Sequence, residues 1–272
     1  MQVLKFGGTS VADSDKIQQV VETVAKAADR DRTILVISAI KGCTDALIRI
    51  GNLAAHRDES YKEVIDGLQE QHHRIISELL PLEKHEESRE ACDGLFDSLR
   101  SIAQGVYLLG ELSPASLDAI QGFGELWSSK IIATKLASIG IATKWIDARE
   151  IIRTVNKGGK NAVDLQKTYS RVNEMIESHP ITQIFVLPGF IASDKQGRTT
   201  TLGRGGSDYS ASLFAVGCKA RALEIWTDVP GMMTANPDIV PSARTIGNIS
   251  YKAALELSHF GAKVIYPPTI QP

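Results

Sequence analysis

The chain has 272 residues, of which 43% are hydrophobic and 22 are glycine, so it can bury a sizeable core as one large α/β domain or as a domain with an insertion. Its 30 Lys and Arg residues against 32 Asp and Glu residues give a net charge of -2, which excludes a global basic field that would attract nucleic acid or an anionic membrane. The chain shows no signal peptide, no apolar run of about 18 residues and no C-x-x-C pair among its three cysteines, so we expect a cytoplasmic protein without a disulfide framework or a zinc site.

The first predicted elements form a phosphate-cradle pattern. A short apolar strand over residues 3–6 runs into Gly7-Gly8-Thr9-Ser10, and an amphipathic helix follows from Asp13. This is neither a Walker loop nor a G-x-G-x-x-G fingerprint, because the lysine, Lys5, lies in the strand before the glycines. A lysine in an apolar strand is costly unless it meets an anion, so Lys5 is predicted to be functional.

A second apolar strand over residues 33–38 ends in a polar loop, in which Ser38 and Thr44 offer hydroxyl groups and the next helix starts at about Thr44. A mostly helical, charged stretch follows from about residue 56 to residue 112. It contains the pair His72-His73, whose side chains point in different directions on a helix, so we interpret them as part of a solvated face rather than as metal ligands.

Ser113-Pro114 predicts a helix start, and the helical pattern runs to about Ser138 with a break near residues 122–124. The β-α alternation then resumes at residues 143–147 and continues through a strand at residues 184–187. No repeat or low-complexity linker divides the chain. The pattern predicts a sandwich of helices around a central sheet, with a helical insertion.

The stretch at residues 199–208, TTTLGRGGSD, is the most informative part of the chain. Three glycines in four residues expose backbone amides beside Arg204, and a helix start at Ser207-Asp208 favours an anion. A tight glycine turn with a solvated Arg204 is the alternative interpretation. A further strand over residues 222–228 ends in Thr227-Asp228, and ligands of α/β sheets bind at such carboxyl ends, so one crevice is expected to collect these residues.

Seven motifs in order resemble those of the aspartokinases over nearly the whole chain: KFGGTS at 5–10, the loop 38–44, GFGE at 122–125, PGFIA at 188–192, TTTLGRGGSD at 199–208, WTDVPG at 226–231 and FGAKVIYP at 260–267. The resemblance is closest to the kinase portion of bifunctional aspartokinase/homoserine dehydrogenases. It implies an amino-acid-kinase fold, a three-layer α/β sandwich with a central, mainly parallel sheet. It also implies transfer of the ATP γ-phosphoryl group to the β-carboxylate of L-aspartate, the first step of lysine, threonine and methionine biosynthesis.

The resemblance also assigns roles to particular residues. Lys5 would bridge the attacking carboxylate and the γ-phosphoryl group, with Asp208 orienting it, and Arg204 would bind the α-carboxylate of aspartate. Further roles would fall to Glu125 and Asp208 at the amino end of aspartate, to pocket residues Ser38, Thr44, Phe190 and Ser207, and to ATP-binding residues Gly7, Gly8, Ser10, Thr227, Asp228 and Lys263. A carboxylate nucleophile is already ionised at neutral pH, so no general base is needed.

Mg²⁺ would be carried by the phosphates of ATP, and no residue is predicted as its ligand. The chain departs from the family pattern at Met233, where a tyrosine is usual, and at Asp238, where an arginine is usual. An aromatic contact and a cation near the nucleotide would therefore be missing, which would weaken ATP binding or shift the base preference.

The last residues, 267–272, follow directly on an expected strand. We therefore expect residues 1–272 to be a kinase domain truncated at its C-terminal end, with a helical insertion at about 56–112 and without the ACT and dehydrogenase domains of the family. The full-length protein is expected to form a homo-oligomer. Two alternatives remain open: a relative acting on acetylglutamate or uridylate, and a non-catalytic ligand-binding fragment.

Overall fold

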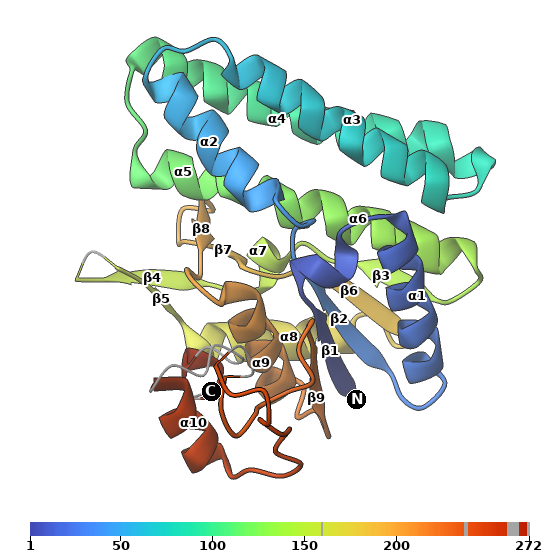
Figure 1. Ribbon diagram of the computed structural model, residues 1–272. Helices are drawn as coiled ribbons and strands as arrows, with labels where there is room; N and C mark the ends of the chain where they lie inside the picture. Colours follow the sequence, from blue (N-terminus) through green and yellow to red (C-terminus); the bar gives the residue numbers. More distant parts are fainter. Residues whose placement is uncertain (159, 237–238, 260–266, 271–272) are drawn as a thin grey trace.

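A five-stranded parallel sheet forms the centre of the molecule (Figure 1). The computed structural model describes residues 1–158, 160–236, 239–259 and 267–270. The strands lie in the order β3-β6-β2-β1-β9, with bounds β1 (Gln2–Phe6), β2 (Thr33–Ile37), β3 (Thr143–Trp145), β6 (Ile184–Pro188) and β9 (Leu223–Trp226). Every residue of β1, β2 and β6 is buried, as expected for parallel strands covered by helices on both faces.

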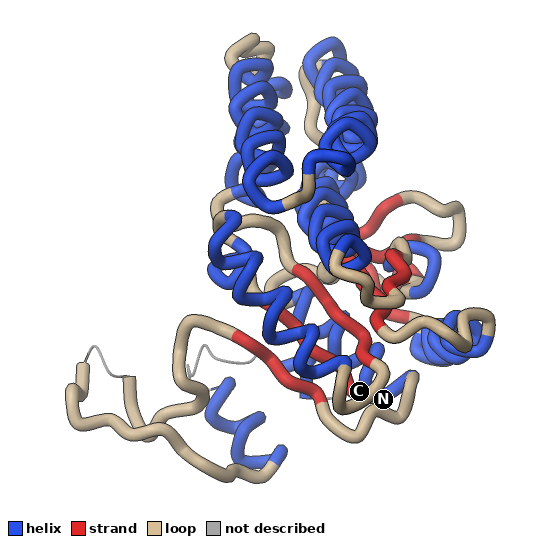
Figure 2. The backbone as a smooth tube through the Cα atoms, turned by 90° about the vertical axis from the view of Figure 1, so that its right-hand side faces the viewer, coloured by secondary structure: helices blue, strands red, loops and turns tan. Residues whose placement is uncertain are grey.

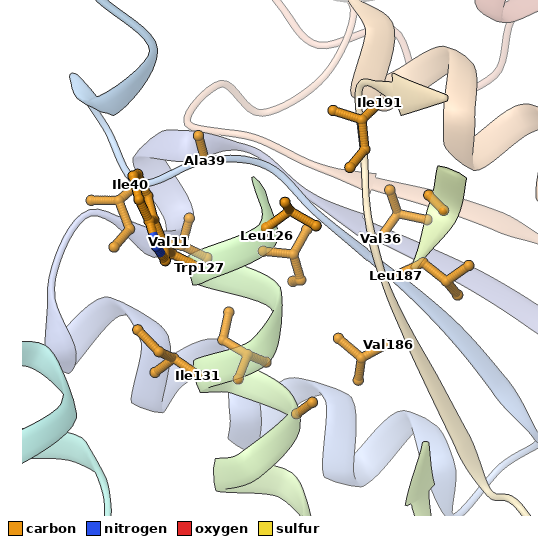
Figure 3. Packing of buried hydrophobic residues seen from close by; sticks show 14 of the residues in the cluster. Val11, Val36, Ala39, Ile40, Leu126, Trp127, Ile131, Val186, Leu187 and Ile191 are labelled. Carbon is orange, nitrogen blue, oxygen red and sulfur yellow. The ribbon is translucent and has the colours of Figure 1, made fainter. Parts of the chain in front are cut away.

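Helices pack against both faces of this sheet. α1 (Ser14–Ala28) and α6 (Phe123–Ser138) cover one face, and α9 (Gly206–Gly217) covers the other with α8 (Leu165–Glu177) packed beside it. Figure 3 shows part of the core, in which Leu126 and Ile131 of α6 lie on the same side of the sheet as Val186, while Val36 and Leu187 point to the opposite face. The predicted three-layer α/β sandwich with a parallel sheet is confirmed.

Local sequence explains where α1 begins and which face it buries. Asp13 caps the helix, because its side chain accepts a hydrogen bond from the Lys16 amide at 2.8 Å. Ile17, Val20 and Val24 recur at helical spacing and are all buried. The amphipathic pattern of the sequence therefore determined both the start and the orientation of this helix.

A second group of helices stands at one end of the molecule, against α6 and away from α10 (Tyr251–His259), as Figures 1 and 2 show. Its members are α2 (Cys43–Ala55), α3 (Tyr61–Leu79), α4 (His85–Leu109) and α5 (Pro114–Gln121). Ser113 caps α5 by accepting a hydrogen bond from the Ser116 amide, and α6 begins one residue after Gly122, as the predicted break implied. The helical character expected for residues 56–112 is thus found in α3 and α4.

The interpretation of His72-His73 as a solvated face is wrong for His72. The His72 ring is fully buried and lies 5.7 Å from the Phe96 ring and 4.9 Å from the Trp127 ring, measured between centroids. His73 is half-buried, and its Nε2 lies 2.7 Å from Asp93 of α4. The packing of α4 and α6 over α3 covers the face that the sequence alone left exposed.

Two small antiparallel pairs were not predicted. β4 (Thr154–Lys157) pairs with β5 (Lys160–Val163), and β7 (Ile191–Ser193) pairs with β8 (Thr199–Thr201). Strands of three or four residues contain too few alternations for the sequence pattern to reveal them. The remaining described elements are η1 (Gly8–Val11), η2 (Leu82–Lys84), α7 (Ala148–Ile151), α10 (Tyr251–His259) and η3 (Pro267–Ile270).

The strand expected just before the chain end falls on residues 260–266, outside the described part of the chain. Among the helices that the structure describes, none combines the length and the apolar character that crossing a membrane requires.

Candidate functional site

A cavity of about 550 Å³ opens where the carboxyl ends of β1 and β2 meet the start of α9. Five chain segments form its wall, each at a strand end or a helix junction of the α/β sandwich. The lining residues are Lys5, Gly8, Ser38, Ala39, Lys41, Gly42, Thr44, Asp45, Gln121, Glu125, Phe190, Thr201, Gly203, Arg204, Gly205, Gly206, Ser207 and Asp208. This is the position at which α/β sheets bind ligands, because loops from several strands converge there.

A buried ion pair lies in the wall of the cavity. Lys5 Nζ is 2.6 Å from Asp208 Oδ1, and the two side chains are only 11% and 14% exposed. Lys5 belongs to β1, where it pairs in register with Val36 and Ile225, and Asp208 lies in the first turn of α9. The strand and the helix thus bring together the two charges that the sequence places 203 positions apart, and Lys5 meets the anion that its burial requires.

Glycine is required at two turns that shape the cavity. Gly205 precedes α9 with φ +67°, a left-handed conformation that costs other residues about 1 kcal/mol. A Cβ atom on Gly8 would lie 2.8 Å from the carbonyl oxygen of Ala39, so only glycine lets the turn after β1 approach the loop after β2 this closely. The backbone geometry therefore explains why the GRGG and GGTS motifs have glycine at these two positions.

Phe190 adopts a strained backbone conformation at the edge of the same cavity. Its φ is +67°, which is unusual for a bulky residue. The Phe190 amide donates to Ser210 Oγ at 3.0 Å, and its carbonyl accepts from the Leu202 amide at 2.8 Å, so α9 and the loop after β8 hold the strained residue in place. Strain of this kind is concentrated at functional sites, where the surrounding structure compensates for it.

Glu125 places an unpartnered carboxylate oxygen in the cavity wall. The residue lies in the first turn of α6, is 4% exposed, and its Oε2 has no hydrogen-bond partner among the described residues. Burial raises the pKa of Glu125 to about 8, against smaller effects of the Ala39 and Glu125 backbone amides. Because a nearby cation would favour the ionised form, this carboxylate is poised to accept a positively charged group of a ligand.

All six residues predicted to bind the acceptor substrate line this one cavity: Ser38, Thr44, Glu125, Phe190, Arg204 and Ser207. Arg204 is exposed and makes no salt bridge within the described residues, so its guanidinium group is available to an anion. Ser38 is fixed through its backbone, because its carbonyl accepts a hydrogen bond from Ser128 Oγ of α6 at 2.9 Å. The arrangement offers a cation, an anion and hydroxyl groups to one small molecule.

The residues predicted to bind ATP are brought together only in part. Lys5 and Gly8 line the cavity, while Gly7, Ser10, Thr227 and Asp228 do not. The Gly7 amide donates to the Trp226 carbonyl at 3.3 Å, which places the end of β9 beside the glycine turn. Thr227 and Asp228 follow β9 directly and are exposed, with Thr227 Oγ1 donating to Asp228 Oδ1 at 3.1 Å. Lys263 lies outside the described residues, as does Asp238.

Four polar residues line the cavity without having been predicted: Lys41, Asp45, Gln121 and Thr201. Lys41 and Thr201 lie inside motifs that the sequence analysis singled out, and Asp45 directly follows one, so their proximity to Thr44 and Arg204 was the available signal. Gln121 ends α5, and nothing in the local sequence indicates that α5 reaches the cavity. Its place depends on the packing of α5 against α2 and β8.

Asp118 of α5 does not line the cavity itself but is hydrogen-bonded to Thr201, which does. Thr201 Oγ1 donates to Asp118 Oδ1 at 2.7 Å, and Asn161 Nδ2 of β5 donates to Asp118 Oδ2 at 3.3 Å. Burial raises the pKa of Asp118, whereas the hydrogen bonds from Thr201 lower it. The sequence analysis gave no role to Asp118.

The sequence matches the amino acid kinase family over residues 1–272. It is 33% identical to the chloroplastic bifunctional aspartokinase/homoserine dehydrogenase 2 of Arabidopsis thaliana, over 99% of this chain and 29% of that protein. It is also 33% identical to the lysine-sensitive aspartokinase 3 of Escherichia coli K12, over 99% of this chain and 58% of that protein.

The fold is similar to that of solved aspartokinases. E. coli aspartokinase III in complex with aspartate and ADP superposes with a TM-score of 0.89 at 32% identity, covering 99% of this chain and 58% of that one. The same enzyme with lysine and aspartate gives a TM-score of 0.87 at 33% identity over all of this chain and 59% of the other. The chain thus spans about three-tenths to six-tenths of the length of these relatives.

Proposed function

The chain belongs to the amino acid kinase family, and from that premise we propose that it is the catalytic domain of an aspartate kinase. It transfers the γ-phosphoryl group of ATP to the β-carboxylate of L-aspartate and gives 4-phospho-L-aspartate and ADP. The observation that carries the proposal is the convergence of the Lys5–Asp208 ion pair, Arg204 and Glu125 on one cavity. The relatives that are named aspartokinases, one of them solved with aspartate and ADP, support the choice of substrates.

In the proposed reaction a β-carboxylate oxygen attacks the γ-phosphorus, and the bond to the β-phosphate oxygen breaks as ADP leaves with the electron pair. Two anions must be aligned, so catalysis consists mainly of positioning and of spreading negative charge. Lys5 is assigned to stabilise the negative charge that develops on the transferred phosphoryl group. Asp208 Oδ1 lies 2.6 Å from Lys5 Nζ, and Asp208 is assigned to orient this ammonium group before the substrate binds.

Arg204 and Glu125 are assigned to the two charged ends of L-aspartate that do not react. The planar guanidinium group of Arg204 suits a bidentate contact with the α-carboxylate. Glu125 accepts the α-ammonium group, whose charge would lower the pKa of the buried carboxyl from about 8. Ser38, Thr44, Phe190 and Ser207 complete the proposed pocket for the acceptor.

The nucleotide side of the proposal rests on the glycine turn after β1 and on the end of β9. Gly7, Gly8 and Ser10 are assigned to the phosphates, and Thr227, Asp228 and Lys263 to the rest of ATP. Mg²⁺ is assigned to the phosphates of the nucleotide; among the described residues, no group of three or more His, Cys, Asp or Glu side chains is arranged to hold a metal ion.

The wider setting is also part of the proposal. The activity supplies the first step of lysine, threonine and methionine biosynthesis, in the cytoplasm, from a kinase domain of residues 1–272 with a helical insertion. Several relatives are named as fusions of an aspartokinase to a homoserine dehydrogenase, and we expect the full-length protein to be a homo-oligomer.

The direct test is a coupled assay of ADP release with L-aspartate, N-acetyl-L-glutamate or UMP as the acceptor, in parallel with trapping of the acyl phosphate by hydroxylamine. We expect ADP release and hydroxamate formation with L-aspartate alone. Turnover with N-acetyl-L-glutamate or UMP instead would identify that compound, and not L-aspartate, as the substrate. Nucleotide binding without turnover of any acceptor would favour a non-catalytic fragment.

A further inference from the structure

Thr201 lines the cavity, and its hydroxyl group is held in a fixed hydrogen-bonding state. Thr201 ends β8, is half-buried and lines the cavity, and its Oγ1 lies 2.7 Å from Asp118 Oδ1. An ionised carboxylate only accepts hydrogen bonds, so the single hydroxyl proton of Thr201 is committed to Asp118. The lone pairs that remain on Oγ1 can therefore only accept a hydrogen bond from a ligand.

Asp118 is held firmly enough to impose this state. Its second oxygen, Oδ2, accepts from Asn161 at 3.3 Å, so both carboxylate oxygens are engaged. The helix junction behind it is closely packed, because a Cβ atom on Gly122 would lie 3.2 Å from side-chain atoms of Ile191 and of Thr199. α5 and the β7–β8 pair thus hold the donor and the acceptor of the Thr201 hydrogen bond in fixed positions.

Residues that carry a cation and a carboxylate line the same cavity. Arg204, three positions after Thr201, provides the cation, while Glu125 provides a buried carboxylate oxygen without a hydrogen-bond partner among the described residues. A hydroxyl group that can only accept adds a second acceptor to the same cavity. An ammonium group has three donors and no acceptor, so it matches two acceptors better than an uncharged or N-acylated group does.

We propose that Asp118 is a positioning residue that makes the Thr201 hydroxyl an obligate hydrogen-bond acceptor, and that Thr201 and Glu125 together select acceptor substrates carrying a free α-ammonium group. This inference rests on the proposed function, because it assigns the α-ammonium group of L-aspartate to these residues. It adds a specificity determinant outside the predicted site residues: a carboxylate that acts through a threonine without touching the substrate.

The test compares ligands with and without the ammonium group. Binding of L-aspartate and of succinate, which lacks that group, is measured by calorimetry on the wild-type chain and on Thr201→Val, Asp118→Ala and the double variant. We expect Thr201→Val to weaken L-aspartate binding about tenfold, the size of a lost hydrogen bond to a charged group, and succinate binding by less than about twofold. Asp118→Ala should also weaken L-aspartate binding more than succinate binding, so the ratio of the two affinities changes in the same direction. The double variant should bind L-aspartate no more weakly than Thr201→Val does.

Thr199→Val is the matched control, because Thr199 lies two residues earlier on the same strand and its hydroxyl accepts from Arg149 outside the cavity. It should leave the ratio of the two affinities unchanged. Additive losses in the double variant, or equal losses for both ligands, would overturn the inference and leave Asp118 a structural residue. A wild-type chain that binds succinate as well as L-aspartate would overturn it too, and no binding of L-aspartate at all would overturn the proposed function with it.

Discussion

Two buried titratable groups in different regions of the molecule respond to burial in opposite ways. Glu125 lies in the wall of the cavity, and burial raises its pKa to about 8. His72 lies among the helices at the end of the molecule, and burial lowers its pKa to about 4. Each has one polar atom without a hydrogen-bond partner among the described residues, Oε2 of Glu125 and Nε2 of His72.

The surroundings of the two groups separate their roles. His72 packs against Phe96 and Trp127, and its Nδ1 lies 2.7 Å from the Leu68 carbonyl, so its neutral form is part of a closed aromatic cluster. Glu125 faces a space that a cation can enter. A buried polar atom therefore indicates a function only where a cavity gives a ligand access to it, and otherwise only reduces stability.

The largest effect that this comparison predicts is on stability in the helical region. Phe96→Ala should reduce the free energy of unfolding by about 3–5 kcal/mol, because the fully buried Phe96 ring stacks on Trp127 with centroids 4.0 Å apart. Urea unfolding measures the loss. The KM values of the remaining folded enzyme should stay within about twofold of wild type. A change in KM for aspartate alone would show that this cluster shapes the cavity.

In the cavity the largest expected effect is on turnover. Lys5→Ala should reduce kcat at least about a hundredfold, or about 3 kcal/mol of barrier, because the lysine is assigned the charge that develops during transfer. Lys62→Ala in the helical region is the matched control, since the exposed Lys62–Glu59 pair at 3.2 Å contributes little. Steady-state kinetics decide the matter: a Lys5→Ala variant that keeps more than about a tenth of wild-type kcat has lost less than ~1.4 kcal/mol, which would rule out the assigned role.

The two buried groups also predict opposite slopes of stability with pH. The depressed pKa of His72 means that its contribution is complete above about pH 6.5 and is lost as the pH falls toward 4, by about 2 kcal/mol at pH 5. The raised pKa of Glu125 means that its contribution is complete below about pH 4.5 and is lost as the pH rises toward 8.

Urea unfolding between pH 4.5 and 8.5 measures both slopes. His72→Leu should remove the acid-side loss without affecting the other slope, and Glu125→Gln should remove the loss at higher pH. Saturating L-aspartate should reduce the Glu125 slope in the wild-type chain, because the bound ammonium group stabilises the carboxylate. A ligand effect on the His72 slope instead would contradict the separation of the two regions.

The smallest effect concerns the KM values for the two proposed substrates, aspartate and ATP. Arg204→Lys keeps the charge and loses the planar fork, so the KM for aspartate should rise about tenfold, or ~1.4 kcal/mol, while that for ATP stays within about twofold. Equal weakening of both substrates would show that Arg204 contacts phosphate or only supports the glycine loop. A change confined to ATP would reverse the assignment.

Local patterns in the amino-acid sequence were enough to predict several parts of the molecule. Continuous apolar runs predicted β1, β2 and β6, and helical spacing with a capping Asp13 predicted α1, because parallel strands buried on both faces and amphipathic helices carry these patterns in their own residues. The motifs around Lys5, Ser38 and Arg204 likewise indicated the residues that line the cavity, since each follows a strand end.

Other features arise from contacts between segments that are distant in the sequence, and they became visible only in the folded chain. The burial of His72 requires α4 and α6, and the hydrogen bond from Thr201 to Asp118 joins residues 83 positions apart. The three-residue strands β7 and β8 form because they pair with each other and pack against α5 and α7. None of these features has a local signature, because whether a polar side chain is solvated, buried or held against a partner is set by neighbours that the chain brings together only when it folds.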